Sequence, residues 1–292
     1  MTLIGFPLWL GDKDKFASKV DEARDAGFDY IELSFDYPWP IPDEETPRKI
    51  ASCAQSAGLD VAIHGSWRDV KLASPMSEIR EASLNYVFKT FEIAKRLEPK
   101  YVVLHISTDQ AVNEVKELEQ PIVDAAIQSA RELIGLASKL GITILFENVP
   151  WSFCSSASHM KKLVSSVSGA EVCFDVGHAW LQALKSSEGR RASVEEVVDM
   201  WVKELGHKIR AVHAHDCLVK RGRVQEHVAP SLDSPFMRSL SRFEERGLRV
   251  HFVVLEVFRR PDGKEASPRD LAKLLEHLRR ACSRGARLSA NY

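Results

Sequence analysis

Carboxylate and imidazole side chains, which bind metal ions and move protons, recur along this chain at the ends of short apolar runs. The segment EVCFDVGH, residues 171–178, places Asp175 directly behind an apolar run. The segment IRAVHAHD, residues 209–216, ends in the same way with His213 and His215. Burying one such group without a partner costs several kcal/mol, so chance would scatter these residues along the chain. We therefore expect them to form one site.

The same pattern closes seven segments of the chain. In chain order the polar residues are Glu32, His64, His105, Glu147, Asp175 with His178, His213 with His215 and Asp216, and Glu256. If these groups point inward, several carboxylates and imidazoles converge at close range. They would repel one another or shift their pKa values strongly unless a cation sat among them. We predict a divalent-metal site built by Glu147, Asp175, His213 and Glu256.

Some of these residues also have plain structural interpretations. Glu32 could pair with a lysine near the mouth of the fold, and we leave it outside the metal set. His64 or His105, taken alone, is more often a hydrogen-bonded core histidine than a ligand. His215 could orient a metal ligand, and Asp216, with the opposite strand parity to His213, could cap the next segment. The remaining histidines are interpreted as structural: His159, His207, His251 and His277.

Eight β-rich runs, separated by segments of helical period, must position these groups. The runs are residues 3–10, 29–35, 60–66, 101–107, 142–150, 171–178, 209–216 and 251–258. Residues 76–97 and 120–140 carry the clearest helical period, and glycines punctuate several of the helix-to-strand turns. This alternation predicts a single closed (β/α)8 TIM barrel spanning residues 1–292, in preference to an open doubly wound sheet. Active sites in such barrels lie at the C-terminal ends of the strands.

Composition, charge and cysteine spacing limit the classes of protein to which the chain can belong. The chain has 292 residues, a formal net charge of −1 and a pI of about 6.8, so no global field draws it to nucleic acid or to an acidic membrane. Its five cysteines are far apart, which favours a reduced, cytoplasmic protein without a disulfide framework. No apolar run is long enough for a membrane span, and the N-terminus has the pattern of a first strand rather than a signal peptide. No glycine-rich nucleotide motif follows any strand.

The chain resembles the xylose-isomerase-like TIM-barrel superfamily, which includes sugar and sugar phosphate isomerases and epimerases as well as endonuclease IV, the apurinic-site nuclease. The resemblance covers about residues 3–280. Its motifs are IHGS, LHIS, FENV, CFDVGHA, VHAHD, QEHVAP and LEV, of which CFDVGHA and VHAHD are the most specific. In the sugar-converting members the metal is held by four positions that correspond here to Glu147, Asp175, His213 and Glu256. The resemblance also implies that Glu147 and Glu256 are the catalytic acid and base.

The endonuclease branch holds more metal ions, and its extra ligands correspond to His64, His105, His178 and His227. In the sugar-converting branch His64 and His178 would instead contact substrate hydroxyls. Gln225 occupies a position where both branches have an aspartate, which argues against a third ion. Glu226 is adjacent, but strand parity predicts that it points elsewhere.

The resemblance implies a metal-dependent isomerase or epimerase acting on a small sugar, sugar phosphate or related hydroxy-ketone through a metal-stabilised enediolate. Its oxygen-rich ligand set predicts Mn²⁺ first, with Zn²⁺, Co²⁺ or Mg²⁺ as alternatives. We expect Arg68, Arg223 and Trp151 to contact the substrate or its phosphate. The alternatives are a zinc-dependent apurinic-site phosphodiesterase, which alone would bind nucleic acid, and a barrel that binds a metabolite without catalysis. No membrane partner is expected, and relatives of this kind are often homo-oligomers.

Overall fold

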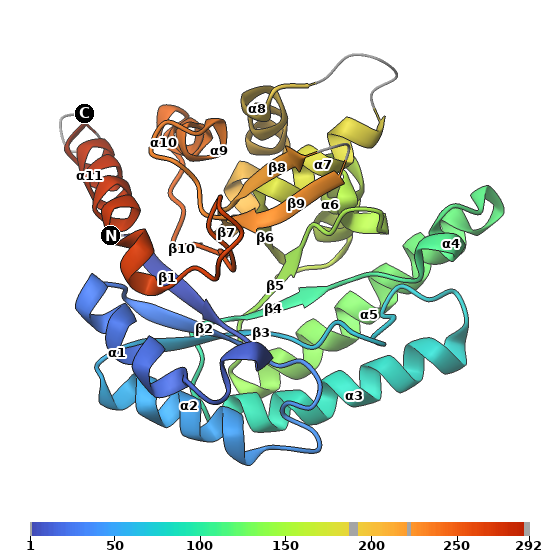
Figure 1. Cartoon of the computed structure of the whole chain (residues 1–292). Helices are drawn as coiled ribbons and strands as arrows, with labels where there is room; N and C mark the ends of the chain where they lie inside the picture. The colour runs from blue at the N-terminus through green and yellow to red at the C-terminus, as the bar shows by residue number, and fades with distance from the viewer. Residues whose placement is uncertain (1, 187–191, 221–222, 289–292) are drawn as a thin grey trace.

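Eight parallel strands close into a barrel in the computed structural model, which describes residues 2–186, 192–220 and 223–288. Around the barrel the strands follow the order β1, β10, β7, β6, β5, β4, β3, β2, with helices between successive strands (Figure 1). Their bounds are β1 Leu3–Leu8, β2 Tyr30–Ser34, β3 Asp60–His64, β4 Val102–His105, β5 Ile144–Glu147, β6 Glu171–Asp175, β7 Ile209–His213 and β10 Phe252–Val254. The predicted (β/α)8 barrel is therefore confirmed, with each expected strand in place.

An inner layer of side chains fills the barrel directly beneath the polar strand ends. It consists of Tyr30, Ala62, Tyr101, Val103, Leu145, Cys173, Ala211 and Val254. Most of these residues stand two positions before a polar residue singled out in the sequence, as Leu145 stands before Glu147 and Val254 before Glu256. Residues two apart share a face of a strand, so the polar groups form the next layer toward the C-terminal mouth.

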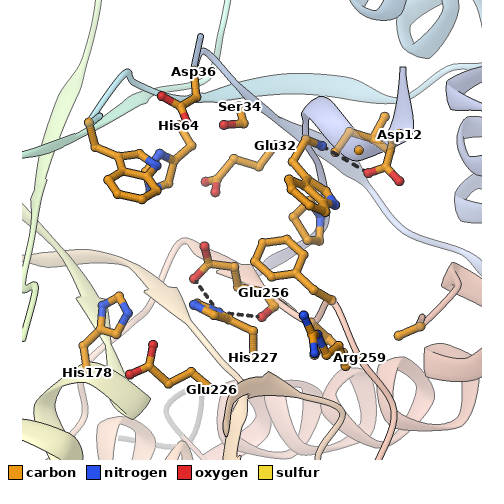
Figure 2. Close-up of a pocket in the computed structure, with 18 of the residues that line it drawn as sticks. Asp12, Glu32, Ser34, Asp36, His64, His178, Glu226, His227, Glu256 and Arg259 are labelled. Atoms are coloured by element: carbon orange, nitrogen blue, oxygen red, sulfur yellow. Dashed lines mark hydrogen bonds and ion pairs between the residues drawn. The ribbon is translucent and has the colours of Figure 1, made fainter. Parts of the chain in front are cut away.

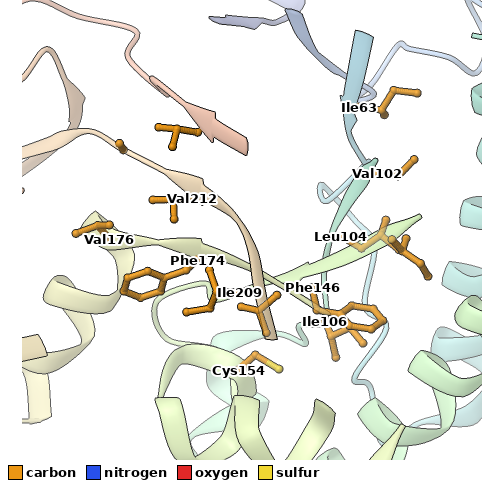
Figure 3. Close-up of a cluster of buried hydrophobic side chains, with 14 of the residues drawn as sticks. Ile63, Val102, Leu104, Ile106, Phe146, Cys154, Phe174, Val176, Ile209 and Val212 are labelled. Atoms are coloured by element: carbon orange, nitrogen blue, oxygen red, sulfur yellow. The ribbon is translucent and has the colours of Figure 1, made fainter. Parts of the chain in front are cut away.

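A larger apolar layer packs the outer face of the barrel against the helices. Figure 3 shows part of it, where Val102, Leu104, Phe146, Phe174 and Val212 point outward from their strands. The strands are thus apolar on both faces, and only their ends carry polar groups toward the mouth.

The helices cover the barrel in chain order (Figure 1). The α-helices are α1 Phe16–Ala26, α2 Glu45–Ser56, α3 Ser77–Lys95, α4 Gln110–Asn113, α5 Glu119–Leu140, α6 Ala157–Ser166, α7 Val176–Ser186, α8 Val194–Leu205, α9 Pro235–Ser239, α10 Ser241–Glu245 and α11 Ala272–Leu288. Short 3-10 turns are η1 Leu10–Asp12, η2 Lys116–Leu118, η3 Phe153–Ser155, η4 Gly206–Lys208 and η5 Pro268–Leu271. Gly27 and Gly141 end α1 and α5 in the left-handed conformation, as the turn signals predicted.

An antiparallel hairpin, formed by β8 Asp216–Lys220 and β9 Arg223–Val228, follows β7 and was not predicted. It starts directly after the polar end of β7 and brings His227 to the same mouth (Figures 1 and 2). Asp216 is therefore the first residue of β8 and accepts a hydrogen bond from Ser234 Oγ at 2.6 Å.

The cysteines and the helices bear on the expectations about disulfides and membrane spans. The four described cysteines, Cys53, Cys154, Cys173 and Cys217, are free thiols, while the side chain of Cys282 lies outside the described part. Among the described helices, none combines the length and the apolar character needed to cross a membrane.

Candidate functional site

A cavity of 860 Å³ opens at the C-terminal ends of the barrel strands. The predicted residues that line it include Glu32, His64, His105, Glu147, His178, His227 and Glu256. Several of them point into the cavity from opposite sides in Figure 2. Asp175 and His213 lie just beneath its floor and are fully buried.

The four predicted metal ligands come together at this floor. Glu147, Asp175, His213 and Glu256 each offer one ligand atom, and these atoms all lie within 4.8 Å of one another. His213 Nδ1 is 3.4 Å from Glu147 Oε2 and 3.2 Å from Glu256 Oε2. The strands therefore place three carboxylates and one imidazole around a single point.

This arrangement fits a divalent cation. Both carboxylate oxygens of Glu147, Oε2 of Glu256 and Nδ1 of His213 are buried without an aligned hydrogen bond among the described residues. Leaving such groups without a partner is costly, and a cation would satisfy all of them together. Carboxylate oxygens with one imidazole suit Mn²⁺, Mg²⁺ or Co²⁺ better than a thiolate-rich set would.

Glu32 orients the imidazole of His213. Nε2 of His213 lies 3.2 Å from Glu32 Oε1, and the Tyr101 hydroxyl donates a hydrogen bond to Glu32 Oε2 at 2.7 Å. Because a carboxylate only accepts, the Nε2 atom of His213 carries a proton, and with a metal ion bound Nδ1 would give its lone pair to that ion between Glu147 and Glu256. The expected lysine partner of Glu32 is replaced by this histidine, since Glu32 lies in the inward polar layer rather than at the rim.

The two glutamates are ionised. Burial alone would raise the pKa of Glu147, but the imidazoles of His213 and His105 outweigh it and hold that pKa well below its usual range. Glu256 behaves in the same way: burial opposes its charge, and His213 and His227 hold its pKa low. Both carboxylates are therefore held in the charged form that binds a cation.

Asp175 is fixed through its backbone and both of its oxygens. Asn148 accepts from the Asp175 N–H and donates to the Asp175 carbonyl, each at 2.8 Å. The His178 backbone N–H donates to Asp175 Oδ1 at 2.6 Å, and His215 Nε2 donates to Asp175 Oδ2 at 3.2 Å. His215 thus orients a predicted ligand, as the sequence suggested.

Gly177 makes room for the His215 ring. A Cβ atom at this glycine would lie 2.1 Å from Cε1 of His215, so any side chain would displace the imidazole. The His227 backbone N–H donates to His215 Nδ1 at 3.1 Å, which assigns the remaining proton of His215 to Nε2. Both ring nitrogens of His215 are therefore engaged in hydrogen bonds.

His64 and His105 form a second group with Glu147. Nε2 of each histidine lies 3.3 Å from Glu147 Oε2, and the two Nε2 atoms are 3.2 Å apart. His64 Nδ1 lies 3.1 Å from the carbonyl of Gly65, a contact that holds a proton on Nδ1 and would leave Nε2 as the ligand atom if an ion were bound. This donor set could hold a second ion that shares Glu147 with the first.

His178 and His227 form a third group with His215. His178 Nδ1 lies 3.1 Å from both Glu147 Oε1 and the Asn148 carbonyl, which leaves Nε2 for a ligand. Burial opposes protonation of His178, but Asp175 and Glu147 outweigh it and raise its pKa to about 9. Because both nitrogens of His215 are engaged and His178 would first have to lose a proton, His227 is the most readily available ligand of this group.

At residues 225 and 226, next to His227, the chain does not follow the regular alternation of an extended strand. Both Gln225 and Glu226 line the cavity, whereas strand parity predicted that Glu226 points elsewhere. His227 has φ +55, a left-handed conformation that interrupts the regular alternation at this point. The position where an aspartate was expected therefore carries a neutral amide beside an additional carboxylate.

The other predicted contact residues lie around the rim. Arg68 lines the cavity, pairs with Asp36 and stacks over the Trp67 ring at 4.4 Å. Trp151 also lines the cavity. Arg223 is exposed on β9 and is not among the lining residues, and its neighbours 221–222 lie outside the described part of the chain.

Comparison with known proteins identifies the family. The model of the xylose isomerase-like TIM barrel family matches residues 20–281. The chain belongs to this family. A protein of Natranaerobius thermophilus described as probable endonuclease 4 is 29% identical over 164 residues, which cover 54% of this chain and 55% of that protein.

Solved structures show the same family fold. A D-tagatose 3-epimerase-like protein superimposes with a TM-score of 0.71 at 18% identity, covering 97% of this chain and 99% of the other. Endonuclease IV of Thermus thermophilus superimposes with a TM-score of 0.60 at 20% identity, covering 97% and 99%. At these identities the likeness concerns the barrel, and the chemistry has to be argued from the residues of this chain.

Within the family barrel, the cavity of this chain is predominantly acidic. Among the described residues that line it, seven are carboxylates, three carry Lys or Arg side chains and four are histidines: Asp12, Glu32, Asp36, Glu147, Glu226, Glu256 and Glu265, then Lys19, Arg68 and Arg259, then His64, His105, His178 and His227. Before a metal ion binds, the excess of carboxylates attracts cations.

Several of the residues that shape the site were not predicted. Asn148 follows the FENV glutamate, Gly177 lies inside CFDVGHA, and Tyr101 directly precedes β4; each has a partner far along the chain. Asn148 and Gly177 lie inside the motifs FENV and CFDVGHA, so these motifs were a reason to consider them as site residues. No motif or spacing pointed to Tyr101.

Proposed function

We propose that this protein is a divalent-metal-dependent isomerase or epimerase that acts on a small uncharged sugar or related hydroxy-ketone. The observation that carries the proposal is the pair of buried glutamates, Glu147 and Glu256, whose carboxylates lie on either side of His213 at the floor of one cavity. Binding alone does not need two opposed carboxylates, whereas moving a proton between two faces of a carbon does. The likeness to a D-tagatose 3-epimerase-like structure supports the same reaction class.

Glu147, Asp175, His213 and Glu256 would hold the metal ion. The ion would supply a Lewis acid that polarises the substrate carbonyl. A carboxylate oxygen of one glutamate would remove the proton from the carbon next to that carbonyl, and the other glutamate would return a proton. Glu32 would keep His213 in the tautomer that leaves Nδ1 toward the ion.

The remaining lining groups would orient the substrate. His178 and His64 face the cavity and would hydrogen-bond substrate hydroxyls. Arg68 and Trp151 at the rim would contact the part of the substrate away from the carbonyl. Outside the candidate metal set, the lining carboxylates Asp12, Glu32, Asp36, Glu226 and Glu265 outnumber Lys19, Arg68 and Arg259, which favours an uncharged substrate over a sugar phosphate or a nucleic acid.

Solvent deuterium exchange tests this proposal. The Mn²⁺-loaded protein, incubated in D₂O with D-fructose, D-tagatose or D-psicose, should incorporate deuterium at the carbon beside the carbonyl. Glu147→Gln and Glu256→Gln should each lower the rate by at least about 100-fold, and Glu132→Gln on the exposed face of α5 should leave it unchanged. Absence of exchange with every ketose would contradict the proposal.

A metal-dependent phosphodiesterase is the second candidate. It is favoured by the His64, His105 and Glu147 group, which could hold a second ion, and by the similarity to a probable endonuclease 4. Nicking of an oligonucleotide with an abasic site by the Zn²⁺-loaded protein would support it. Binding of a ketose without deuterium exchange or nicking would instead support a metabolite-binding barrel.

A further inference from the structure

The cavity continues beyond the candidate metal site into a region that the proposed reaction does not use. We call this region the side lobe and define it by Trp9, Asp12, Lys19, Phe258, Arg259 and Glu265, all of which line the same cavity as Glu256. The whole cavity measures 860 Å³, near the upper end of the range of about 300–1,000 Å³ found for sites that hold drug-sized ligands. A single monosaccharide would leave much of this space unfilled.

A fixed aromatic platform forms one wall of the side lobe. The ring centroids of Trp9 and Phe258 are 5.6 Å apart, and the Trp9 side chain is 41% exposed. Gly11 lies against the indole, since a Cβ atom there would lie 2.7 Å from Cζ2 of Trp9. The indole therefore packs against Gly11 on one side, while part of its surface stays exposed.

A group of charges, in which Asp12 and Lys19 are buried and Glu265 is exposed, also borders the side lobe. Lys19 Nζ lies 2.5 Å from Asp12 Oδ1 and 2.7 Å from Glu265 Oε1. Asp12 is 1% exposed and Lys19 is 7% exposed. Burying paired charges costs desolvation free energy, which their mutual attraction has to offset. The ion pairs also connect η1 and α1 to the segment before η5. They give the side lobe hydrogen-bonding groups that are already fixed in place.

We propose that the side lobe binds the second sugar ring of a glycoside whose keto sugar occupies the metal end of the cavity. The apolar face of a pyranose stacks on an aromatic ring, and its hydroxyls need donors and acceptors at the edge, which Trp9 and the Asp12–Lys19–Glu265 group supply. Phe258 is two residues from Glu256, so their Cα atoms are at most about 7 Å apart. The two sites are thus close enough for adjacent rings of one disaccharide.

A nucleobase could stack on the same indole, but its phosphates would meet the carboxylates of this cavity. Lys19 and Arg259 balance Asp12 and Glu265 within the side lobe, while Glu32, Asp36 and Glu226 line the rest of the cavity. An uncharged glycoside avoids that repulsion. The inference rests on the proposed function only for the placement of the keto sugar.

Calorimetric binding to the Mn²⁺-loaded protein tests the proposal without requiring turnover. Lactulose, maltulose and isomaltulose, which are ketose disaccharides, are compared with D-fructose. At least one disaccharide should bind about tenfold more tightly than D-fructose, and Trp9→Ala should remove that preference. Gly11→Ala, which displaces the indole without deleting it, should reduce the preference too. Tyr37→Ala, an exposed aromatic outside the cavity lining, should retain it.

Two results would overturn the proposal: no disaccharide binding more tightly than D-fructose, or a preference that survives both Trp9→Ala and Gly11→Ala. Deuterium exchange is measured separately on the same protein. A disaccharide preference that depends on Trp9, found together with no exchange for any ketose, would remove the proposed reaction while the side lobe stands as a sugar site.

Discussion

Glu32 on β2 and His213 on β7 meet inside the barrel, with Glu32 Oε1 3.2 Å from Nε2 of His213. The two residues come from strands separated by β1 and β10, and both are fully buried. This contact assigns the proton of His213 to Nε2 and directs Nδ1 toward Glu147 and Glu256. The contact thus joins the packed interior of the barrel to the candidate metal site above it.

Removing this carboxylate should weaken metal binding. We expect Glu32→Ala to lower the affinity for Mn²⁺ by about 10–100-fold, because His213 loses the partner that fixes its tautomer and its ring orientation. Glu32→Gln, whose amide oxygen can still accept from Nε2, should lose less. Calorimetric titration with Mn²⁺ measures both, and equal affinity in wild type and Glu32→Ala would exclude this role.

Gly177→Ala should also weaken metal binding, although glycine carries no ligand. The added methyl group would displace His215, which donates to Asp175 Oδ2. We expect a loss of about tenfold in Mn²⁺ affinity, as for other groups that orient ligands. Gly135→Ala is a matched control in α5, where no other atom lies within 4 Å of the added carbon. That control should keep its affinity, and a similar loss in both variants would contradict the explanation.

Tyr101→Phe should destabilise the fold with little change in shape. The Tyr101 hydroxyl donates to Glu32 Oε2 at 2.7 Å and lies 3.1 Å from the Tyr30 hydroxyl. Its removal leaves a buried carboxylate with one partner fewer, which should lower the free energy of unfolding by about 1–3 kcal/mol. Urea denaturation measures the difference, with the half-buried Tyr86→Phe as the comparison. An unchanged midpoint in Tyr101→Phe would show that the contact contributes nothing measurable.

Metal removal should lower the melting temperature. Without a cation, Glu147, Asp175 and Glu256 keep three carboxylates in close proximity, and a bound ion stabilises only the folded chain. At a free concentration 100 times the dissociation constant the gain is about 2.7 kcal/mol. Thermal unfolding with Mn²⁺, and again after chelation, measures it. An identical transition in both conditions would mean that the cluster binds no ion.

The barrel and the composition of the site could be predicted because one regularity produces both. Strands that are apolar on two faces and polar at their last inward position give a closed sheet with a polar layer at one end, as Leu145 before Glu147 illustrates. Partners across the barrel could not be predicted in this way. Strand parity shows that Glu32 points inward, but the tilt of the barrel decides that it meets His213 rather than a lysine.

Elements whose geometry depends on contacts outside the barrel were missed or misjudged. The β8–β9 hairpin is short and mostly polar, so its pattern carried little strand signal. The left-handed conformation of His227 interrupts the regular alternation of side-chain directions from which the orientation of Glu226 was predicted. Trp9 was included in the first strand, whereas β1 ends at Leu8 and the indole turns to the side lobe.

Anomalous diffraction from Mn²⁺-loaded crystals would show whether an ion binds between the four strand-end residues. We expect a single strong peak about 2.0–2.2 Å from ligand atoms of Glu147, Asp175, His213 and Glu256, with His213 coordinating through Nδ1. A map with only solvent at that point, and with these four side chains turned away from one another, would contradict it.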